Sequence, residues 1–276
     1  MKPYQLGLYE KAMPNGASWA EKLTAAKNAG FDFVEISIDE TDAKQVRLDW
    51  TAGERAEMRR VMEDCGLPIR TMCLSGHRKY PFGSRDAATR EKSLVIMDKA
   101  IGLACDLGIR IIQLAGYDVY YEEGGEDTRA YFAENLKKAV DMASAGGVIM
   151  GFETMETPFM DTISKSMRYV KEMNSPYLGV YPDLGNLNNA MLKYGGKMED
   201  EFAACEGHIF AMHIKETEPG KYRDMHFGEG RVDFVKGIEL ARRAGVSLFV
   251  SECWHDGCED WQGSIKAVND FVRSKF

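Results

Sequence analysis

The sequence predicts a (β/α)8 barrel in which residues 1–276 form a single domain. The first observation behind this prediction is a repeated unit, in which an amphipathic helical stretch is followed by a glycine and a short apolar run. The second is the number of such runs, about eight at a period of roughly thirty residues, which is the size of a βα unit. An open doubly wound sheet is the alternative, but no GxGxxG follows the first apolar run.

The apolar runs are the expected strands of the barrel. They are short and continuous rather than alternating, which is typical of parallel strands covered on both faces. The pattern places them at Gln5–Tyr9, Phe33–Ser37, Ile69–Leu74, Ile111–Ala115, Val148–Glu153, Leu178–Tyr181, Ile209–His213 and Leu248–Glu252.

Glycines mark the expected ends of the helices. Gly30, Gly66, Gly108, Gly146 and Gly245 each lie between a helical stretch and an apolar run. The residue that ends a helix often adopts a left-handed conformation, which glycine reaches without a steric penalty. We therefore expect a helix to end at each of these five positions.

The charge balance excludes several classes of function. The chain has 35 Lys and Arg against 43 Asp and Glu, which gives a formal net charge of −8. This acidic balance argues against a nucleic-acid partner, and no apolar run is long enough to cross a membrane. The first residues contain no apolar segment of signal-peptide length, so we expect a cytoplasmic protein that acts on a small molecule.

Polar residues end the last four expected strands. The segments "GFE", "VYPD", "AMH" and "VSE" place Glu153, Asp183, His213 and Glu252 at equivalent positions. Consecutive strands of a closed barrel are neighbours, so these side chains should converge at its C-terminal face, where barrel enzymes carry their chemistry. Three carboxylates and one imidazole suit a divalent ion such as Mn²⁺, Mg²⁺, Co²⁺ or Zn²⁺. The sequence therefore predicts one divalent metal ion as cofactor.

Each of these residues also has a structural explanation. Taken alone, Asp183 is more often an N-cap of the following helix than a ligand. His213 is equally a candidate for a hydrogen-bonded core residue, and Glu252 for a partner of a nearby cation. The two roles of Asp183 are compatible, since one oxygen can accept a backbone N–H from "LGN" while the other faces the ion.

Longer phrases resemble the sugar epimerases of the xylose isomerase-like barrel family. "GFETM", "YPDLGN", "MHIKE" and "VSECW" are similar to that branch in general. "LGLYEKAMP", "MCLSGHRKYPFGS" and "FGEGRVDF" resemble more narrowly the L-ribulose-5-phosphate (L-xylulose-5-phosphate) 3-epimerases of L-ascorbate and related pentose catabolism. The matching phrases run from near residue 6 to near residue 254, so the resemblance covers nearly the whole chain.

The resemblance implies an isomerase that inverts C3 of a ketopentose 5-phosphate through a metal-stabilised cis-enediolate. It gives Glu153 and Glu252 two roles, as metal ligands and as the acid and base on opposite faces of the sugar. Asp183 and His213 would then be ligands only. Related barrels also lead us to expect a homodimer.

Substrate contacts are expected from four further residues, His77, Asn186, Lys215 and Arg223. Asn186 stands where the non-phosphorylated ketose 3-epimerases carry a histidine, and His77 is equally well explained as a solvated loop residue. Lys215 is closest in sequence to His213 among the candidates for a phosphate contact. The others are Arg78, Lys79, Lys221 and Arg223, for which surface exposure is the alternative explanation.

Three other functions are compatible with a barrel of this kind. The first is another metal-dependent sugar isomerase or an inosose dehydratase of the same superfamily. The second is a phosphodiesterase acting on abasic DNA, against which the net charge and the total of five histidines argue. The third is a barrel that binds sugars without catalysis, which would have no need for two opposed acid/base groups.

Overall fold

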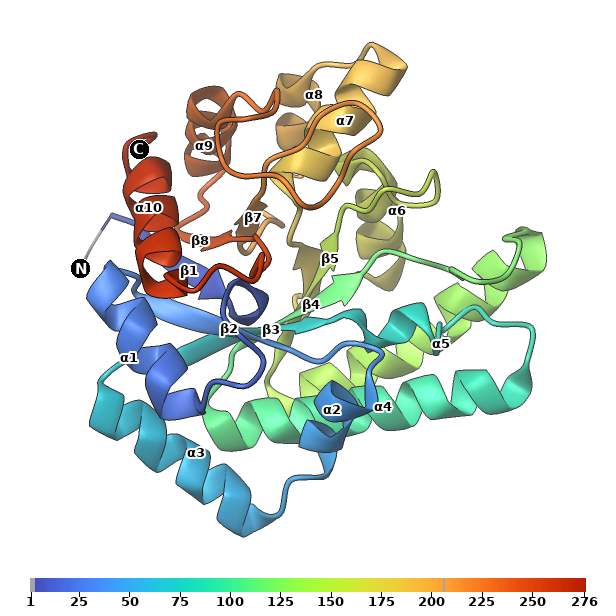
Figure 1. The fold of residues 1–276 in the computed structure, drawn as a ribbon. Helices are drawn as coiled ribbons and strands as arrows, with labels where there is room; N and C mark the ends of the chain where they lie inside the picture. The colour runs from blue at the N-terminus through green and yellow to red at the C-terminus, as the bar shows by residue number, and fades with distance from the viewer. Residues whose placement is uncertain (1–2, 206) are drawn as a thin grey trace.

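The computed structural model describes residues 3–205 and 207–276, with an eight-stranded sheet at its centre and helices around it (Figure 1). The strands are β1 (Gln5–Tyr9), β2 (Phe33–Ser37), β3 (Ile69–Leu74), β4 (Ile111–Ala115), β5 (Ile149–Glu153), β6 (Leu178–Val180), β7 (Met212–Ile214) and β8 (Leu248–Ser251). The helices are α1 (Trp19–Ala29), α2 (Asp42–Gln45), α3 (Ala52–Cys65), α4 (Ala87–Leu107), α5 (Glu126–Gly146), α6 (Ile163–Met173), α7 (Leu184–Tyr194), α8 (Met198–Ala204), α9 (Phe234–Arg243) and α10 (Trp261–Arg273). Short 3-10 helices are η1 (Glu10–Ala12), η2 (Val46–Asp49) and η3 (Ser75–Arg78).

The strands pair in parallel in the order β6-β5-β4-β3-β2-β1-β8-β7, which confirms the predicted (β/α)8 barrel. Regular pairing stops at β6 and β7, and isolated parallel bridges join these two edges at Val180–Ile209 and Asp183–His213. Pro182 lies between the two bridges and has no N–H to donate, which explains why the ladder does not continue along β6. The joint that closes the barrel thus places Asp183 directly beside His213.

The predicted strand positions match the structure closely, and the largest difference is in β7. This strand covers Met212–Ile214 rather than Ile209–His213, because Ile209 makes only an isolated bridge to Val180. The boundaries of β5, β6 and β8 differ from the prediction by a single residue each.

The helix ends follow the glycines, with one correction. Gly30, Gly66 and Gly108 have left-handed φ values of 99°, 61° and 73° and end α1, α3 and α4. The prediction for Gly146 is wrong, since Gly146 is the last residue of α5 and Gly147 takes the left-handed conformation. The sequence has two successive glycines here, and the helix continues through the first.

Side chains of each strand alternate between two cores. Those that point outward, such as Leu6, Leu8 and Ile36, pack against the surrounding helices. Those that point into the barrel include Tyr9, Phe33, Cys73, Ile111, Tyr181 and Val250. The inner set also contains charged side chains that are buried, and these build the site described below.

The two ends of the chain meet at α1 and α10, which pack against each other (Figure 1). Helix α1 begins with a capping box between Ser18 and Glu21, and α3 begins with one between Thr51 and Glu54. Within residues 3–205 and 207–276, none of the helices combines the length and apolar character that a membrane crossing requires.

Candidate metal centre and active site

The structure brings together the four polar residues at the C-terminal ends of β5 to β8. Glu153 is the last residue of β5, Asp183 precedes α7, His213 lies in β7 and Glu252 follows β8. One potential ligand atom from each lies within 4.8 Å of the others. All four residues are buried, with at most 7% of their surface exposed.

Asp183 combines the two roles that its position suggests. Its Oδ1 accepts the backbone N–H of Asn186 at 2.6 Å and so caps α7. Its Oδ2 is buried and has no hydrogen-bond partner among the described residues. A buried anionic oxygen without a partner is costly, and its place within the cluster makes it available to a cation.

The electrostatics of the cluster also favour a bound cation. Burial and the nearby charge of Glu252 raise the pKa of Glu153 to about 8. Burial, together with Glu252, raises the pKa of Asp183 to about 7, although Lys215 opposes this effect. For Glu252, burial alone would raise the pKa, but Lys215 and His213 outweigh it and lower the value. The cluster therefore carries more buried carboxylates than its own cations neutralise, and the donor set fits a divalent ion.

Lys215 lies deeper than a phosphate contact would require. The residue is 5% exposed, and its Nζ lies 3.4 Å from Asp183 Oδ1 and 3.3 Å from Glu252 Oε2. Burial lowers the pKa of this ammonium, but the surrounding carboxylates more than offset that effect and raise it. Lys215 is thus a charged neighbour of two candidate ligands.

A small cavity opens above the cluster. Its walls include Glu153, Glu252, Lys215, Asn186, Arg78, Arg223, Lys11, Ser75, Tyr9, Tyr222 and Trp254. The guanidinium of Arg78 lies 5.0 Å from the ring centroid of Tyr120, and that of Arg223 lies 5.8 Å from the ring centroid of Trp254. The cavity is therefore lined by both carboxylates and cations, and two of its guanidinium groups lie near aromatic rings.

Asn186 lines this cavity, and one of its two polar side-chain atoms has no partner among the described residues. Its Nδ2 donates a hydrogen bond to the carbonyl of Thr154 at 2.8 Å, which fixes the orientation of the amide. Its Oδ1 is buried and has no hydrogen-bond partner among the described residues. The arrangement suits recognition of a hydroxyl group.

The comparisons with known proteins agree with this architecture. A family model described as the xylose isomerase-like TIM barrel matches residues 23–275. The chain belongs to this family. A relative from Salmonella paratyphi A, named L-ribulose-5-phosphate 3-epimerase UlaE, is 42% identical over 275 residues, which are 99% of this chain and 95% of the relative. The predicted resemblance is therefore confirmed, and the chain is an isomerase of the sugar epimerase class.

Solved structures share the same fold at low sequence identity. An L-ribulose 3-epimerase superposes with a TM-score of 0.78 at 18% identity, covering 99% of this chain and 94% of the other. A xylose isomerase-like TIM barrel protein from Mycobacterium smegmatis, solved in complex with magnesium, gives a TM-score of 0.71 at 19% identity, covering 99% and 96%.

His77 does not line the cavity in this barrel. Its side chain is 4% exposed, its Nε2 lies 3.1 Å from the carbonyl of Ser93, and its ring packs against Phe82. Burial lowers the pKa of His77 to about 4. The residue is therefore buried, and the alternative explanation as a solvated loop residue is wrong. Its contact with Ser93 connects η3 to α4.

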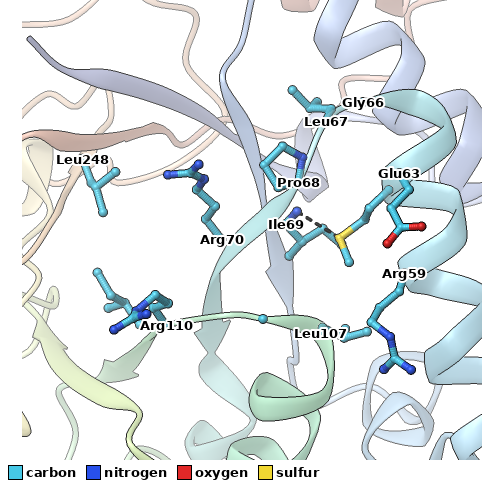
Figure 2. A pocket seen from close by; sticks show the side chains of 13 residues that line it. Arg59, Glu63, Gly66, Leu67, Pro68, Ile69, Arg70, Leu107, Arg110 and Leu248 are labelled. Atoms are coloured by element: carbon cyan, nitrogen blue, oxygen red, sulfur yellow. Dashed lines mark hydrogen bonds between the residues drawn. The ribbon is translucent and has the colours of Figure 1, made fainter. Parts of the chain in front are cut away.

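A larger hollow lies at the other end of the barrel. Its volume is about 630 Å³, and it opens at Ile69, Ile111 and Leu248, which begin β3, β4 and β8. Figure 2 shows Arg70 and Arg110 along its wall. Enzymes with this fold carry their chemistry at the C-terminal ends of the strands, so volume alone does not locate the active site.

Two acidic residues near the site were missed by the sequence analysis. Glu35 lies inside the barrel on β2 and contacts His213, and Glu156 accepts a hydrogen bond from the hydroxyl of Tyr117 at 2.6 Å beside the cavity. Glu35 had a detectable signal, because it is a single charged residue inside the apolar strand "FVEIS" and glutamates are rarely buried unless paired. Glu156 lies in a loop and had no such signal.

Proposed function

We propose that this protein interconverts L-ribulose 5-phosphate and L-xylulose 5-phosphate by inverting C3 in a metal-dependent reaction. The observation that carries the proposal is the buried cluster of four ligand atoms within 4.8 Å of one another. Its position supports the same reaction, since it lies at the C-terminal end of a barrel whose 42% identical relatives are named for it.

The proposed cofactor is one divalent ion held by Glu153, Asp183, His213 and Glu252. This donor set suits Mn²⁺, Mg²⁺, Co²⁺ or Zn²⁺, and a more distant barrel of the same family was solved with magnesium. When bound, such an ion would supply positive charge to the oxygens on C2 and C3 of the ketose, which lowers the pKa of the C3 proton.

The two glutamates are proposed to move the C3 proton. One glutamate, as the carboxylate, removes it, and the C–H electrons pass into the enediolate. The other glutamate, as the carboxylic acid, delivers its proton to the opposite face of C3. Glu153 and Glu252 come from β5 and β8 and flank the ligands from β6 and β7, so they reach the substrate from two sides. Lys215 lies beside Glu252 and Asp183, where its charge would stabilise the anion that develops.

The rest of the sugar phosphate is proposed to occupy the cavity. The free Oδ1 of Asn186 would accept a hydrogen bond from a sugar hydroxyl, and Arg223 with Arg78 would bind the 5-phosphate. His77 is better placed to support η3, which carries Ser75 and Arg78, than to touch the sugar. A homodimer, a cytoplasmic location and the lack of a nucleic-acid or membrane partner remain predictions.

An assay of substrate conversion tests the proposal. NMR should show that the metal-loaded protein converts L-ribulose 5-phosphate to L-xylulose 5-phosphate, and that EDTA abolishes the conversion. Glu153→Gln and Glu252→Gln should each lower kcat by at least about 100-fold, the lower range for a general acid or base. Turnover that persists in EDTA would refute the metal dependence, and conversion to an aldose would indicate a sugar isomerase instead.

A further inference from the structure

Glu35 is a carboxylate buried in the middle of the barrel, just below the candidate metal ligands. It is 0% exposed and points inward from β2. Its Oε1 lies 2.6 Å from Nε2 of His213. Its Oε2 accepts hydrogen bonds from the hydroxyls of Tyr181 and Thr71, at 2.8 and 2.7 Å. Both oxygens are therefore engaged, and each contact is made inside the barrel.

The charge of Glu35 is not matched by a strong cation. Among the described residues, its one ion-pair partner is the imidazole of His213, and no lysine or arginine pairs with it. Burial of a carboxylate is costly, and a packed apolar residue at such a position is often neutral or stabilising. A contribution to stability therefore does not explain why a carboxylate is buried here. Its contact with His213 indicates a functional role instead.

The hydrogen bonds of Glu35 determine which nitrogen of His213 carries the proton. An ionised carboxylate only accepts hydrogen bonds, so Nε2 must be the donor. A metal ion binds the neutral imidazole, in which Nδ1 then carries the lone pair. This atom faces the site, 3.1 Å from Glu252 Oε2 and 3.8 Å from Glu153 Oε1.

We propose that Glu35 is a positioning residue that holds His213 in the Nε2–H form, with Nδ1 directed at the metal ion. Histidines that bind metals commonly donate their other N–H to a carboxylate, which fixes the ring and makes it a stronger ligand. The inference rests on the proposed metal site and adds to it a residue that touches neither metal nor substrate.

The packing around Glu35 keeps the imidazole in this orientation. The rings of Tyr181 and His213 meet edge to face, with centroids 5.1 Å apart, while the Tyr181 hydroxyl reaches Glu35. Gly151 on β5 makes room for the base of the Tyr181 side chain, because a Cβ there would lie 2.7 Å from the Cβ of Tyr181. The ring and the carboxylate therefore restrain His213 from two directions.

Metal affinity of Glu35→Gln tests this role. Glutamine keeps the size and shape of the side chain, but it removes the charge and replaces one of the two accepting oxygens with an amide nitrogen that only donates. We expect the variant to bind Co²⁺ about 10- to 100-fold more weakly than the wild type, the range for loss of an outer partner of a metal-bound histidine. Affinity is measured by chelator competition, and the visible spectrum of the Co²⁺ protein reports the ligand set.

Tyr181→Phe is the matched control, since it removes a hydrogen bond to the same carboxylate but leaves the contact between Glu35 and His213. Its Co²⁺ affinity should change by less than about threefold, well below the range expected for Glu35→Gln. Equal losses in the two variants would overturn the proposal, because general packing would then explain both. Wild-type affinity in Glu35→Gln would also overturn it, whereas a wild-type protein that binds no metal would refute the proposed function.

The tautomer itself can be measured without any folding risk from the Glu35 variant. A ¹⁵N–¹H spectrum of the Zn²⁺-loaded wild-type protein should show His213 protonated at Nε2 and not at Nδ1. Assignment uses the signals lost in His213→Asn, recorded on the metal-free proteins. A proton on Nδ1 in the loaded protein would overturn the proposal even if Glu35→Gln does not fold.

Discussion

Substitutions of Asp183 can separate effects on folding from effects on metal binding, because one of its carboxylate oxygens caps α7 and the other is a candidate metal ligand. Oδ1 accepts the N–H of Asn186 at 2.6 Å, and Oδ2 is the buried oxygen without a described partner. Asparagine caps helices about as well as aspartate. The variant Asp183→Asn should therefore keep the cap and lose the anionic ligand, while Asp183→Ala should lose both.

The expected magnitudes differ for the two variants. Asp183→Ala should have a free energy of unfolding about 1 kcal/mol lower than that of Asp183→Asn in the metal-free protein, because only the alanine variant loses the cap. Asp183→Asn should be no less stable than the wild type at pH 8. Burial and neighbouring charge raise the pKa of this carboxyl to about 7, so the wild type loses stability as the pH rises through that value and the amide does not. Both variants should bind metal at least about 100-fold more weakly, the upper range for loss of an outer partner.

Urea unfolding and isothermal calorimetry with Mn²⁺ measure these two quantities. Asp86→Ala is the matched control, because the exposed Asp86 caps α4 through Thr89 N at 2.8 Å, away from the metal cluster. It should lose about 1 kcal/mol and keep its metal affinity. The reasoning is refuted if Asp183→Asn binds Mn²⁺ as the wild type does, or if Asp183→Ala is as stable as Asp183→Asn.

Three further predictions concern other parts of the barrel. Burial lowers the pKa of His77 in the folded protein to about 4, below its unfolded value near 6.5. Lowering the pH from about 7 to 4 should therefore reduce the free energy of unfolding by up to about 3 kcal/mol. In urea unfolding, the stability of His77→Gln should depend less steeply on pH than that of the wild type, and an equal slope would contradict this. Arg78→Met should raise the KM for the phosphorylated ketose at least about tenfold, but it should leave the KM for the free ketose unchanged. The control Arg59→Met, in the hollow at the other end of the barrel, should change neither KM. Equal effects of Arg78→Met on both substrates would show that Arg78 does not bind the phosphate. Gly151→Ala should destabilise the protein by about 1–3 kcal/mol, because the new Cβ would lie 2.7 Å from the Cβ of Tyr181. At Gly16 a new Cβ would meet nothing within 4 Å, so Gly16→Ala should cost less than about 0.5 kcal/mol. Similar shifts in melting temperature for the two variants would contradict the packing argument.

The strands and the four-residue cluster were predictable because each depends on local patterns. Continuous apolar runs located the strands, and the barrel rule brought the residues that follow them to one face. The closing edge was harder to predict. Nothing in "GHIFAMHIKE" shows that regular pairing begins only at Met212, because that depends on how Pro182 interrupts the neighbouring strand.

Residues whose roles depend on depth inside the barrel were not predictable from position alone. Lys215 follows His213 by two residues, so both point inward, but the sequence does not reveal that its ammonium lies between Asp183 and Glu252. His77 stands in a polar loop phrase, yet the ring turns away from the cavity toward Ser93. Glu35 meets His213 across the barrel, 178 positions away in the chain, and such a contact leaves no local pattern.

Solvent isotope exchange tests the central claim most directly. The metal-loaded protein is incubated with L-ribulose 5-phosphate in D₂O, and the recovered sugars are examined by NMR. Proton transfer at C3 predicts deuterium at C3 of the L-xylulose 5-phosphate that forms, and no exchange after treatment with EDTA. Deuterium confined to C1 or C2, or exchange at C3 that continues without metal, would contradict a metal-dependent 3-epimerase.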